Sequence, residues 1–468
     1  MHSTVFERHR PTASVVSNAL SDTRHAVFWR DDIAQPEHPR LARDMPADLV
    51  VVGAGYTGLW TAVRAKERDP DLRVVVLDAR TVGWAASGRN GGFCETSLTH
   101  GAENGIRRWP EEFPRLERLG RQNLDEIEAT IARYGMDAEF ERTGTLSVAV
   151  EPHQIDWVAQ DPGFLDAAQT RALVDSPTYL AGAWERRDTA LVHPAKLARE
   201  LARVAGELGV EIFEHSRVTG LTEADAGTGL LARTAAGAVR AERVALGTNV
   251  FPSLLRRNRL MTVPVYDYVL VTEPLSAAQW ASVGWEGRQG IADLANQFHY
   301  YRRTADGRIL FGGYDAVYHP GGRVRAAYEE RPSSFETLAA HFFTTFPQLE
   351  GLRFSHRWAG AIDSCSRFCA FYGTARRGRV AYATGFTGLG VGASRFGADV
   401  MLDLLSGEHT ERTALRMVRE KPIPFPPEPA ATIGVELVRW SMDRADHNEG
   451  RRNALLKTLD ALGMGFDS

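Results

Sequence analysis

The chain has 468 residues, a formal net charge of −4 at pH 7, 44% hydrophobic residues and 24% charged residues. This is an ordinary globular composition, and the length predicts two joined domains rather than a single core. The small net charge indicates no nucleic-acid partner. The three cysteines are too few for a disulfide framework. Because Cys365 and Cys369 lack a second ligand pair with zinc spacing, no metal site is predicted.

Apolar runs in the sequence are too short to cross a membrane, since none approaches the roughly 20 residues that a spanning helix needs. Residues 1–10 also lack the hydrophobic segment of a secretion signal. We therefore expect a soluble, cytoplasmic protein without a membrane span. Residues 1–44 are polar and rich in Arg, Asp and Pro, with Phe28 and Trp29 as apolar anchors. They predict an extended arm lying over the domain that follows.

The pattern changes at residue 48, where 48–53 form an apolar, β-branched run that ends in a glycine turn. This run predicts a buried parallel strand. A helix is predicted over 56–68 and a second buried strand over 73–78. Strand, glycine turn, helix and strand within about thirty residues make one βαβ unit.

Further α/β elements follow in chain order, with a strand-rich stretch between them. Helices are predicted over 109–134 and 194–209, strands over 210–214, 243–247 and 379–384, a β-hairpin over 298–303 and 308–313, a helix after 385–390 that ends near 406, and tail helices around 435–444 and 451–462. These separated returns to α/β structure indicate a nucleotide-binding domain built from several segments, with a second domain inserted between them.

The glycine turn carries the dinucleotide-binding spacing G-x-G-x-x-G at Gly53, Gly55 and Gly58. Gly53 permits the tight turn, Gly55 lets a pyrophosphate approach the backbone, and Gly58 lets helix and strand pack closely. Asp78 ends the next strand twenty residues after Gly58, where a carboxylate can bind an adenosine ribose. The alternative is a purely structural glycine turn. Because strand, helix and acid are all in place, we predict dinucleotide binding.

A second glycine-rich loop over residues 83–92 favours FAD over NAD. It follows the acidic residue closely and offers hydroxyl, amide and guanidinium donors from Ser87, Asn90 and Arg89. Such a loop can extend along the second half of a long dinucleotide, which a nicotinamide enzyme would not need at this point.

On these motifs the chain resembles the D-amino-acid oxidase and glycine oxidase family of FAD-dependent oxidoreductases, and most of all its γ-glutamylputrescine oxidase-like branch. The resemblance rests on residues 51–59, 83–92 and 385–390, with support from 191–194 and 243–248. It covers about residues 45–410. The implied fold class is α/β and α+β, with a Rossmann-type FAD-binding domain in separated segments and an inserted mixed-sheet substrate domain. The expected boundaries are 1–44 for the arm, 45–95, 186–262 and 356–410 for the FAD-binding domain, 96–185 and 263–355 for the substrate domain, and 411–468 for a helical tail.

The same resemblance implies which residues contact FAD. It places Gly53, Ala54, Gly55, Tyr56, Thr57 and Gly58 at the pyrophosphate, Asp78, Ala79 and Arg80 at the adenosine, Val218 at the adenine through its backbone, Ser87, Gly88, Arg89, Asn90, Gly91 and Gly92 along the ribityl chain, and Gly385, Thr387, Gly388, Leu389 and Gly390 at the pyrimidine side of the flavin ring. A helix N-terminus at that last position would stabilise the negative charge of a reduced flavin.

Two departures from the family pattern limit what is carried over. Sarcosine-oxidase-like relatives attach FAD to a cysteine about where this chain has Trp358, so we expect noncovalent FAD. The same relatives carry His and Lys in the final glycine turn, where this chain has Leu389 and Gly392. Without that lysine, a small α-amino acid carboxylate is not expected to be held beside the flavin.

The hairpin strand over 298–303 is the expected substrate wall. Strand alternation puts Tyr300 and Arg302 on one face, where Arg302 can fork a carboxylate and Tyr300 can orient an amine. The alternative is a surface strand with ordinary ion pairs. Tyr266, on a strand predicted after Pro264, is a further candidate for the catalytic site.

These expectations combine into one function with two alternatives. We expect an enzyme that oxidises a C–N bond of a small-molecule amine, such as γ-glutamylputrescine, by hydride transfer to FAD with O2 as acceptor. The first alternative is a flavin dehydrogenase that uses a quinone or a protein as electron acceptor. The second is a non-catalytic flavin-binding partner protein.

Overall fold

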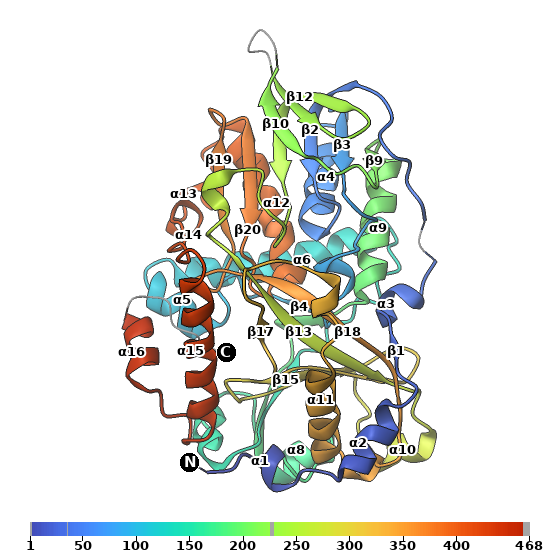
Figure 1. Ribbon diagram of the computed structural model, residues 1–468, viewed down its shortest axis with the longest axis vertical. Coiled ribbons are helices and arrows are strands. Elements are labelled where there is room, and N and C mark those ends of the chain that lie inside the picture. Colours follow the sequence, from blue (N-terminus) through green and yellow to red (C-terminus); the bar gives the residue numbers. More distant parts are fainter. Residues whose placement is uncertain (1, 35, 225–228, 462–468) are drawn as a thin grey trace.

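The computed structural model describes residues 2–34, 36–224 and 229–461. Two large mixed sheets divide the molecule along its long axis, an eight-stranded sheet in the upper half of Figure 1 and a ten-stranded sheet below it. The helices are α1 (Val5–Arg8), α2 (Ala13–Leu20), α3 (Phe28–Asp31), α4 (Tyr56–Arg68), α5 (Ala102–Arg108), α6 (Phe113–Arg133), α7 (Ile155–Val158), α8 (Ala167–Leu173), α9 (Pro194–Glu207), α10 (Ala277–Val283), α11 (Pro332–Thr345), α12 (Gly390–Ser406), α13 (Glu411–Ala414), α14 (Arg416–Arg419), α15 (Ala430–Asp446) and α16 (Ala454–Ala461).

The eight-stranded sheet is built from strands that lie far apart in the sequence. Its members are β2 (Met45–Val52), β3 (Val74–Leu77), β9 (Glu211–Phe213), β10 (Gly220–Glu223), β11 (Leu230–Arg233), β12 (Ala238–Leu246), β19 (Phe371–Ala375) and β20 (Val380–Thr384). β2 lies between β3 and β12, and β20 also pairs with β12, all in parallel. The predicted segmented Rossmann-type sheet is therefore confirmed.

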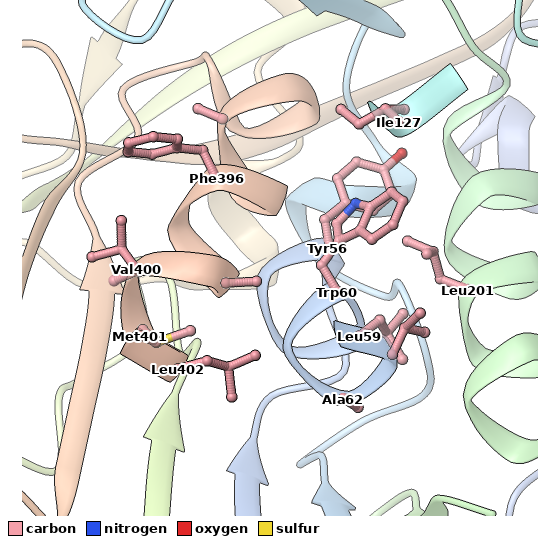
Figure 2. Packing of buried hydrophobic residues seen from close by; sticks show 14 of the residues in the cluster. Tyr56, Leu59, Trp60, Ala62, Ile127, Leu201, Phe396, Val400, Met401 and Leu402 are labelled. Carbon is pink, nitrogen blue, oxygen red and sulfur yellow. The ribbon is translucent and has the colours of Figure 1, made fainter. Parts of the chain in front are cut away.

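The helix α4 is central to this half of the molecule and begins and ends where the sequence predicts, at Tyr56 and Arg68. Figure 2 shows Leu59 and Trp60 of α4 packed between Leu201 of α9 and the α12 residue Met401. All four side chains are buried. Each such burial stabilises the fold by about 1.5–3 kcal/mol, so α4 holds the glycine turn before it in a fixed position.

The ten-stranded sheet lies in the lower half of the molecule as drawn in Figure 1. Its members are β1 (Arg24–His25), β5 (Thr145–Ala149), β6 (Phe164–Asp166), β7 (Ala181–Glu185), β13 (Val263–Thr272), β14 (Gly290–Asp293), β15 (His299–Arg303), β16 (Ile309–Gly313), β17 (Val317–Tyr318) and β18 (Phe354–Ser364); a separate pair joins β4 (Phe93–Glu95) to β8 (Thr189–Leu191). The predicted hairpin is β15–β16, an antiparallel pair. Phe342 of α11 packs on one face of the sheet. On the other face, Val269 of β13 shares a core cluster with Ala195 of α9 and with two tryptophans, Trp29 of α3 and Trp358 of β18.

The N-terminal arm differs from its prediction, because most of it is not extended. It forms α1, α2 and α3, and β1 pairs in parallel with β18 of the second sheet. Val5, Phe6 and Val16 are buried in the core of that sheet. Such short helices are not stable alone, and contacts with distant strands supply their stability. The apolar anchors Phe28 and Trp29 are buried as predicted.

Two other helix predictions need adjustment. The helix expected over 109–134 begins later, as α6 at Phe113, because Pro114 suits only the first turn of a helix; α5, which lies before it and ends at Arg108, was not predicted. The tail helices extend over α15 and α16, and the predicted end at Leu462 lies outside the described residues. Among the described helices, none is long and apolar enough to cross a membrane.

Candidate functional site

The turn between β2 and α4 has the geometry that its three glycines predict. Gly53 adopts φ +109°, and a Cβ there would strike the carbonyl oxygen of Gly247. A Cβ on Gly58 would overlap the carbonyl of Gly53. No other residue can occupy either position without moving the backbone.

The side chain of Ser87 contacts the N-terminus of α4. The Tyr56 N–H donates to Ser87 Oγ at 2.9 Å, and a Cβ on Gly55 would lie 2.9 Å from the same oxygen. The Gly83 N–H also donates to the carbonyl of Ala54 at 2.9 Å. The glycine loop and the start of α4 are thus one unit, and its hydroxyl and first-turn N–H groups form a site suited to a diphosphate.

Asp78, which follows the end of β3, is hydrogen-bonded to the turn between β2 and α4. Its Oδ2 accepts the Ala54 N–H at 2.6 Å and its Oδ1 accepts the Arg80 N–H at 2.7 Å. Burial raises the pKa of the carboxyl group. Each oxygen keeps a free lone pair, so Asp78 can still accept a ribose hydroxyl. Val218 is buried in the core beside β3, and Arg80 lies 5.1 Å from the ring of Trp84.

Two buried tryptophans hold the loop that continues to Gly92. Trp29 Nε1 donates to the carbonyl of Asn90 at 2.9 Å, and Trp358 Nε1 donates to that of Arg89 at 2.8 Å. Within the loop the Gly92 N–H donates to Asn90 Oδ1 at 2.8 Å. The arm and the second sheet therefore fix a loop that belongs to the first sheet's site.

The final glycine turn leads from β20 into α12. Gly385 and Gly388 have φ of +75° and +94°, and nothing lies within 4 Å of a Cβ built on Gly388. Asp363 Oδ2 accepts the Gly385 N–H at 2.6 Å, and burial raises the pKa of this carboxyl to about 6. No side chain caps α12 at Leu389. Its first N–H groups are thus available to a flavin ring, and open space at Gly388 fits the approach of one.

Gly392 lies in the first turn of α12 with no space for a side chain. A Cβ there would strike the carbonyl oxygen of Glu95 in β4, and its own carbonyl accepts Asn123 Nδ2 at 2.9 Å. The lysine carried by sarcosine-oxidase-like relatives could not be accommodated at this position without moving the backbone.

Tyr300 and Arg302 share one face of β15, as alternation predicts, and that face meets the glycine loop. A Cβ on Gly91 would lie 2.6 Å from Tyr300 Cε2, and one on Gly92 would strike Arg302 Nη1. Tyr300 Oη donates to Asp267 Oδ2 of β13. Asp267 was not predicted from the sequence, although a single acid within an apolar and aromatic strand is a signal for such a residue.

Arg302 differs from the expected carboxylate fork. The side chain is 0% exposed, and its Nη1 donates to the carbonyl of Val192 at 2.6 Å and to that of Gly92 at 3.3 Å. Burial lowers its pKa to about 9. One side of the guanidinium therefore binds the chain's own loops, while Nη2 is buried without a hydrogen-bond partner among the described residues.

Tyr266 is also not brought together with Tyr300. It lies on the opposite face of β13, where its Oη accepts the Arg325 N–H at 3.0 Å and its ring meets that of Tyr328 edge-on at 5.9 Å. The physical reason is strand alternation, which directs Asp267 and not Tyr266 toward the loop.

Comparison with known proteins identifies the family. A family model described as "DAO: FAD dependent oxidoreductase" matches residues 48–404. The chain belongs to this family of FAD-dependent oxidoreductases. FAD is therefore its cofactor, and the glycine turns, the Ser87 hydroxyl and the start of α12 are the elements that fit it.

Relatives of this flavoenzyme cover most of its length. It is 30% identical to γ-glutamylputrescine oxidoreductase of Escherichia coli over 82% of this chain and 89% of that protein. It is 26% identical to "Probable oxidoreductase OrdL" of Haemophilus influenzae, over 83% and 87%. The crystal structure of glycine oxidase from Geobacillus kaustophilus matches with a TM-score of 0.64 and 17% identity, over 78% and 96%, which shows a shared fold.

Proposed function

We propose that this flavoenzyme oxidises a C–N bond of an amine that has no carboxylate on any carbon bonded to its nitrogen, with O2 as the electron acceptor. Bound FAD would supply the acceptor for a hydride from the carbon beside the nitrogen, and water then hydrolyses the resulting imine to a carbonyl compound and a free amine. A γ-glutamylputrescine-like amine fits this class, and the name of the Escherichia coli relative supports it.

The observation that carries the proposal is the contact between Gly392 and the Glu95 carbonyl. It excludes a side chain, and therefore a cation, at position 392, where sarcosine-oxidase-like relatives carry a lysine. Leu389, the residue before the helix, adds no charge. An α-carboxylate would have no cationic partner there, whereas an amine without one meets no such penalty.

The protein residues have three tasks in this reaction: to position the substrate, to exclude water and to keep the loop in place. Trp29 and Trp358 fix the loop through its carbonyls, and both indoles are 1% exposed. Tyr300 lies with its ring against Gly91 and its hydroxyl hydrogen-bonded to Asp267. A fixed, dry site contributes to rate by orienting the reacting C–H bond.

Steady-state turnover tests the proposal. The flavin-loaded protein is assayed with γ-glutamylputrescine, putrescine, sarcosine, glycine and D-alanine, and both carbonyl product and H2O2 are measured. We expect turnover of the first two and little of the three α-amino acids. Efficient turnover of glycine or sarcosine would contradict the proposed substrate class.

The two alternatives give different results in a reoxidation experiment. The protein is photoreduced without oxygen and then mixed with air or with a soluble quinone. Rapid return of the flavin absorbance in air supports an oxidase, and return only with the quinone indicates a dehydrogenase. Failure of every amine to reduce the flavin would leave the non-catalytic alternative.

Noncovalent attachment of FAD is part of the proposal. Trp358 lies about where sarcosine-oxidase-like relatives carry the attaching cysteine, and its indole N–H donates a hydrogen bond to the Arg89 carbonyl. Acid precipitation should leave the yellow colour in the supernatant. Colour that stays with the denatured protein would contradict this part.

A further inference from the structure

Asp267 is a charged residue on the sheet face that meets the glycine loop, and no role has been assigned to it so far. Its strand β13 is apolar on both sides of it. Its Oδ2 accepts the Tyr300 hydroxyl and its Oδ1 accepts the Gly313 N–H at 3.1 Å. The Tyr300 ring in turn rests on Gly91 and meets Phe93 edge-on at 5.8 Å. The carboxylate thus reaches the loop through one intervening side chain.

Glycines surround this carboxylate. Its cross-strand neighbour on β18 is Gly360, where a Cβ would find only the Cβ of Arg89, at 3.8 Å. On β16, Gly312 leaves room for Tyr300, whose Oη would lie 2.7 Å from a Cβ there. Tyr300 therefore covers Asp267 on the Gly312 side, and the Gly360 side, between the sheet and the loop, is left without a close side chain.

Asp267 has no cationic partner among the described residues. Its interacting groups are Tyr300, two backbone N–H groups and the like-charged Asp315, and Arg89 on the facing loop is paired with Glu329 at 2.5 Å. Burial, with Asp315 as a smaller cause, raises the pKa of Asp267 to about 6. A carboxylate that is charged at neutral pH but desolvated and unpaired is costly to the fold. Its presence beside a cofactor loop therefore indicates a ligand that brings the missing charge.

We propose that Asp267, with Tyr300, receives the amino group that is oxidised. This inference rests on the proposed function and names its recognition element. The substrate ammonium replaces the missing counter-ion of Asp267 when it binds and passes one proton to that carboxylate, which frees the nitrogen lone pair that the imine needs. The remaining lone pair of Tyr300 Oη accepts an N–H of the neutral amine. The same negative charge repels an α-carboxylate. Selection for amines without an α-carboxylate therefore has two sources, the carboxylate of Asp267 on the sheet and the lack of a cation at Gly392.

The test is Asp267→Asn in the flavin-loaded protein. Asparagine keeps an oxygen for the Gly313 N–H and can donate Nδ2–H to Tyr300 Oη, so the packing is preserved while the charge is lost. The matched control is Asp306→Asn at the tip of the β15–β16 hairpin, where the carboxylate is 41% exposed. We expect kcat/KM for the best amine to fall at least roughly 30-fold in Asp267→Asn, mainly through KM, and to be unchanged in the control.

A second readout needs no turnover. The visible absorbance of the bound flavin is followed against pH, and in the wild type a titration near pH 6 should include a component that Asp267→Asn lacks. Asp363 titrates in the same range, so only the difference between the two proteins counts. Tyr300→Phe gives a third variant that keeps the charge; KM should rise several-fold and the titration should remain.

The outcomes separate this inference from the proposed function. If the wild type oxidises amines and Asp267→Asn keeps both its KM and its titration near pH 6, the Asp267 assignment is wrong and amine oxidation stands. If no amine reduces the wild type, the proposed function fails first. Should Asp267→Asn not fold, an unchanged KM in Tyr300→Phe overturns the pair as the amine site.

Discussion

The carbonyl oxygen of Glu95 occupies the space that a side chain on Gly392 would need. Gly392→Lys should therefore not restore an amino-acid carboxylate site but displace the first turn of α12. We expect a loss of about 1–3 kcal/mol in the free energy of unfolding and a lower FAD occupancy. The control is Gly206→Lys in α9, where a Cβ meets nothing within 4 Å. Denaturant unfolding and flavin content report both effects. A stable, flavin-loaded Gly392→Lys protein that oxidises sarcosine would refute this interpretation.

Gly55→Leu should abolish FAD binding while the rest of the fold persists. The new side chain would start 2.9 Å from Ser87 Oγ and fill the site between the loop and α4. Equilibrium dialysis with FAD should show at least about a hundredfold weaker binding than for Gly206→Leu, the matched variant at an exposed position of α9. Unchanged FAD affinity in a folded Gly55→Leu protein would mean that this turn is not the phosphate site.

Arg302→Met should weaken FAD binding rather than change substrate selectivity. The variant leaves the carbonyl of Val192 without its donor, so the Gly92 loop is held less firmly. The loss of one charge-assisted hydrogen bond predicts roughly a tenfold increase in the FAD dissociation constant. Global stability should change little, because removal of a buried charge offsets the lost bonds.

Arg303→Met is the control for that variant, since Arg303 binds backbone carbonyls on the other face of β15 and stacks on Trp280 at 3.9 Å. Its FAD affinity should equal that of the wild type. If Arg302→Met keeps its FAD affinity but selectively loses activity on a carboxylate-bearing amine, Arg302 holds a substrate carboxylate after all.

Asp363 should make stability depend on pH. Its folded pKa is raised from 3.8 to about 6 by burial, so its contribution is fully present below the unfolded value and is lost as pH rises through about 6. Asp363→Asn has no such titration and keeps an acceptor for the Gly385 N–H. We expect the variant to gain up to about 3 kcal/mol on the wild type across this interval. Urea unfolding of both proteins on either side of pH 6 checks this, and parallel stabilities would contradict it.

Local patterns made the nucleotide-binding half predictable from the sequence. The bounds of α4 and the positive φ of Gly53 follow from apolar periodicity and glycine spacing, which act within a few residues. The helices of the arm did not follow, because Val5 and Phe6 are stabilised by strands far away in the chain.

The substrate side was only half predictable for the same reason. Alternation along β15 correctly put Tyr300 and Arg302 on one face, but no local rule says what that face meets. Arg302 turned out to meet the Val192 carbonyl, 110 residues away, and Tyr300 to meet Asp267, 33 residues away. The first contact depends on which loop packs against β15 and the second on the order of strands within the ten-stranded sheet, and single-sequence patterns do not contain that information.

The central claim is that the flavin in this protein accepts electrons from a simple amine. The most direct measurement is anaerobic mixing of the flavin-loaded protein with each amine of the panel while the visible flavin absorbance is recorded. We predict that γ-glutamylputrescine or a related amine removes this absorbance at a rate that saturates with concentration, and that glycine and D-alanine do not. If dithionite reduces the flavin but no amine does, the account is contradicted.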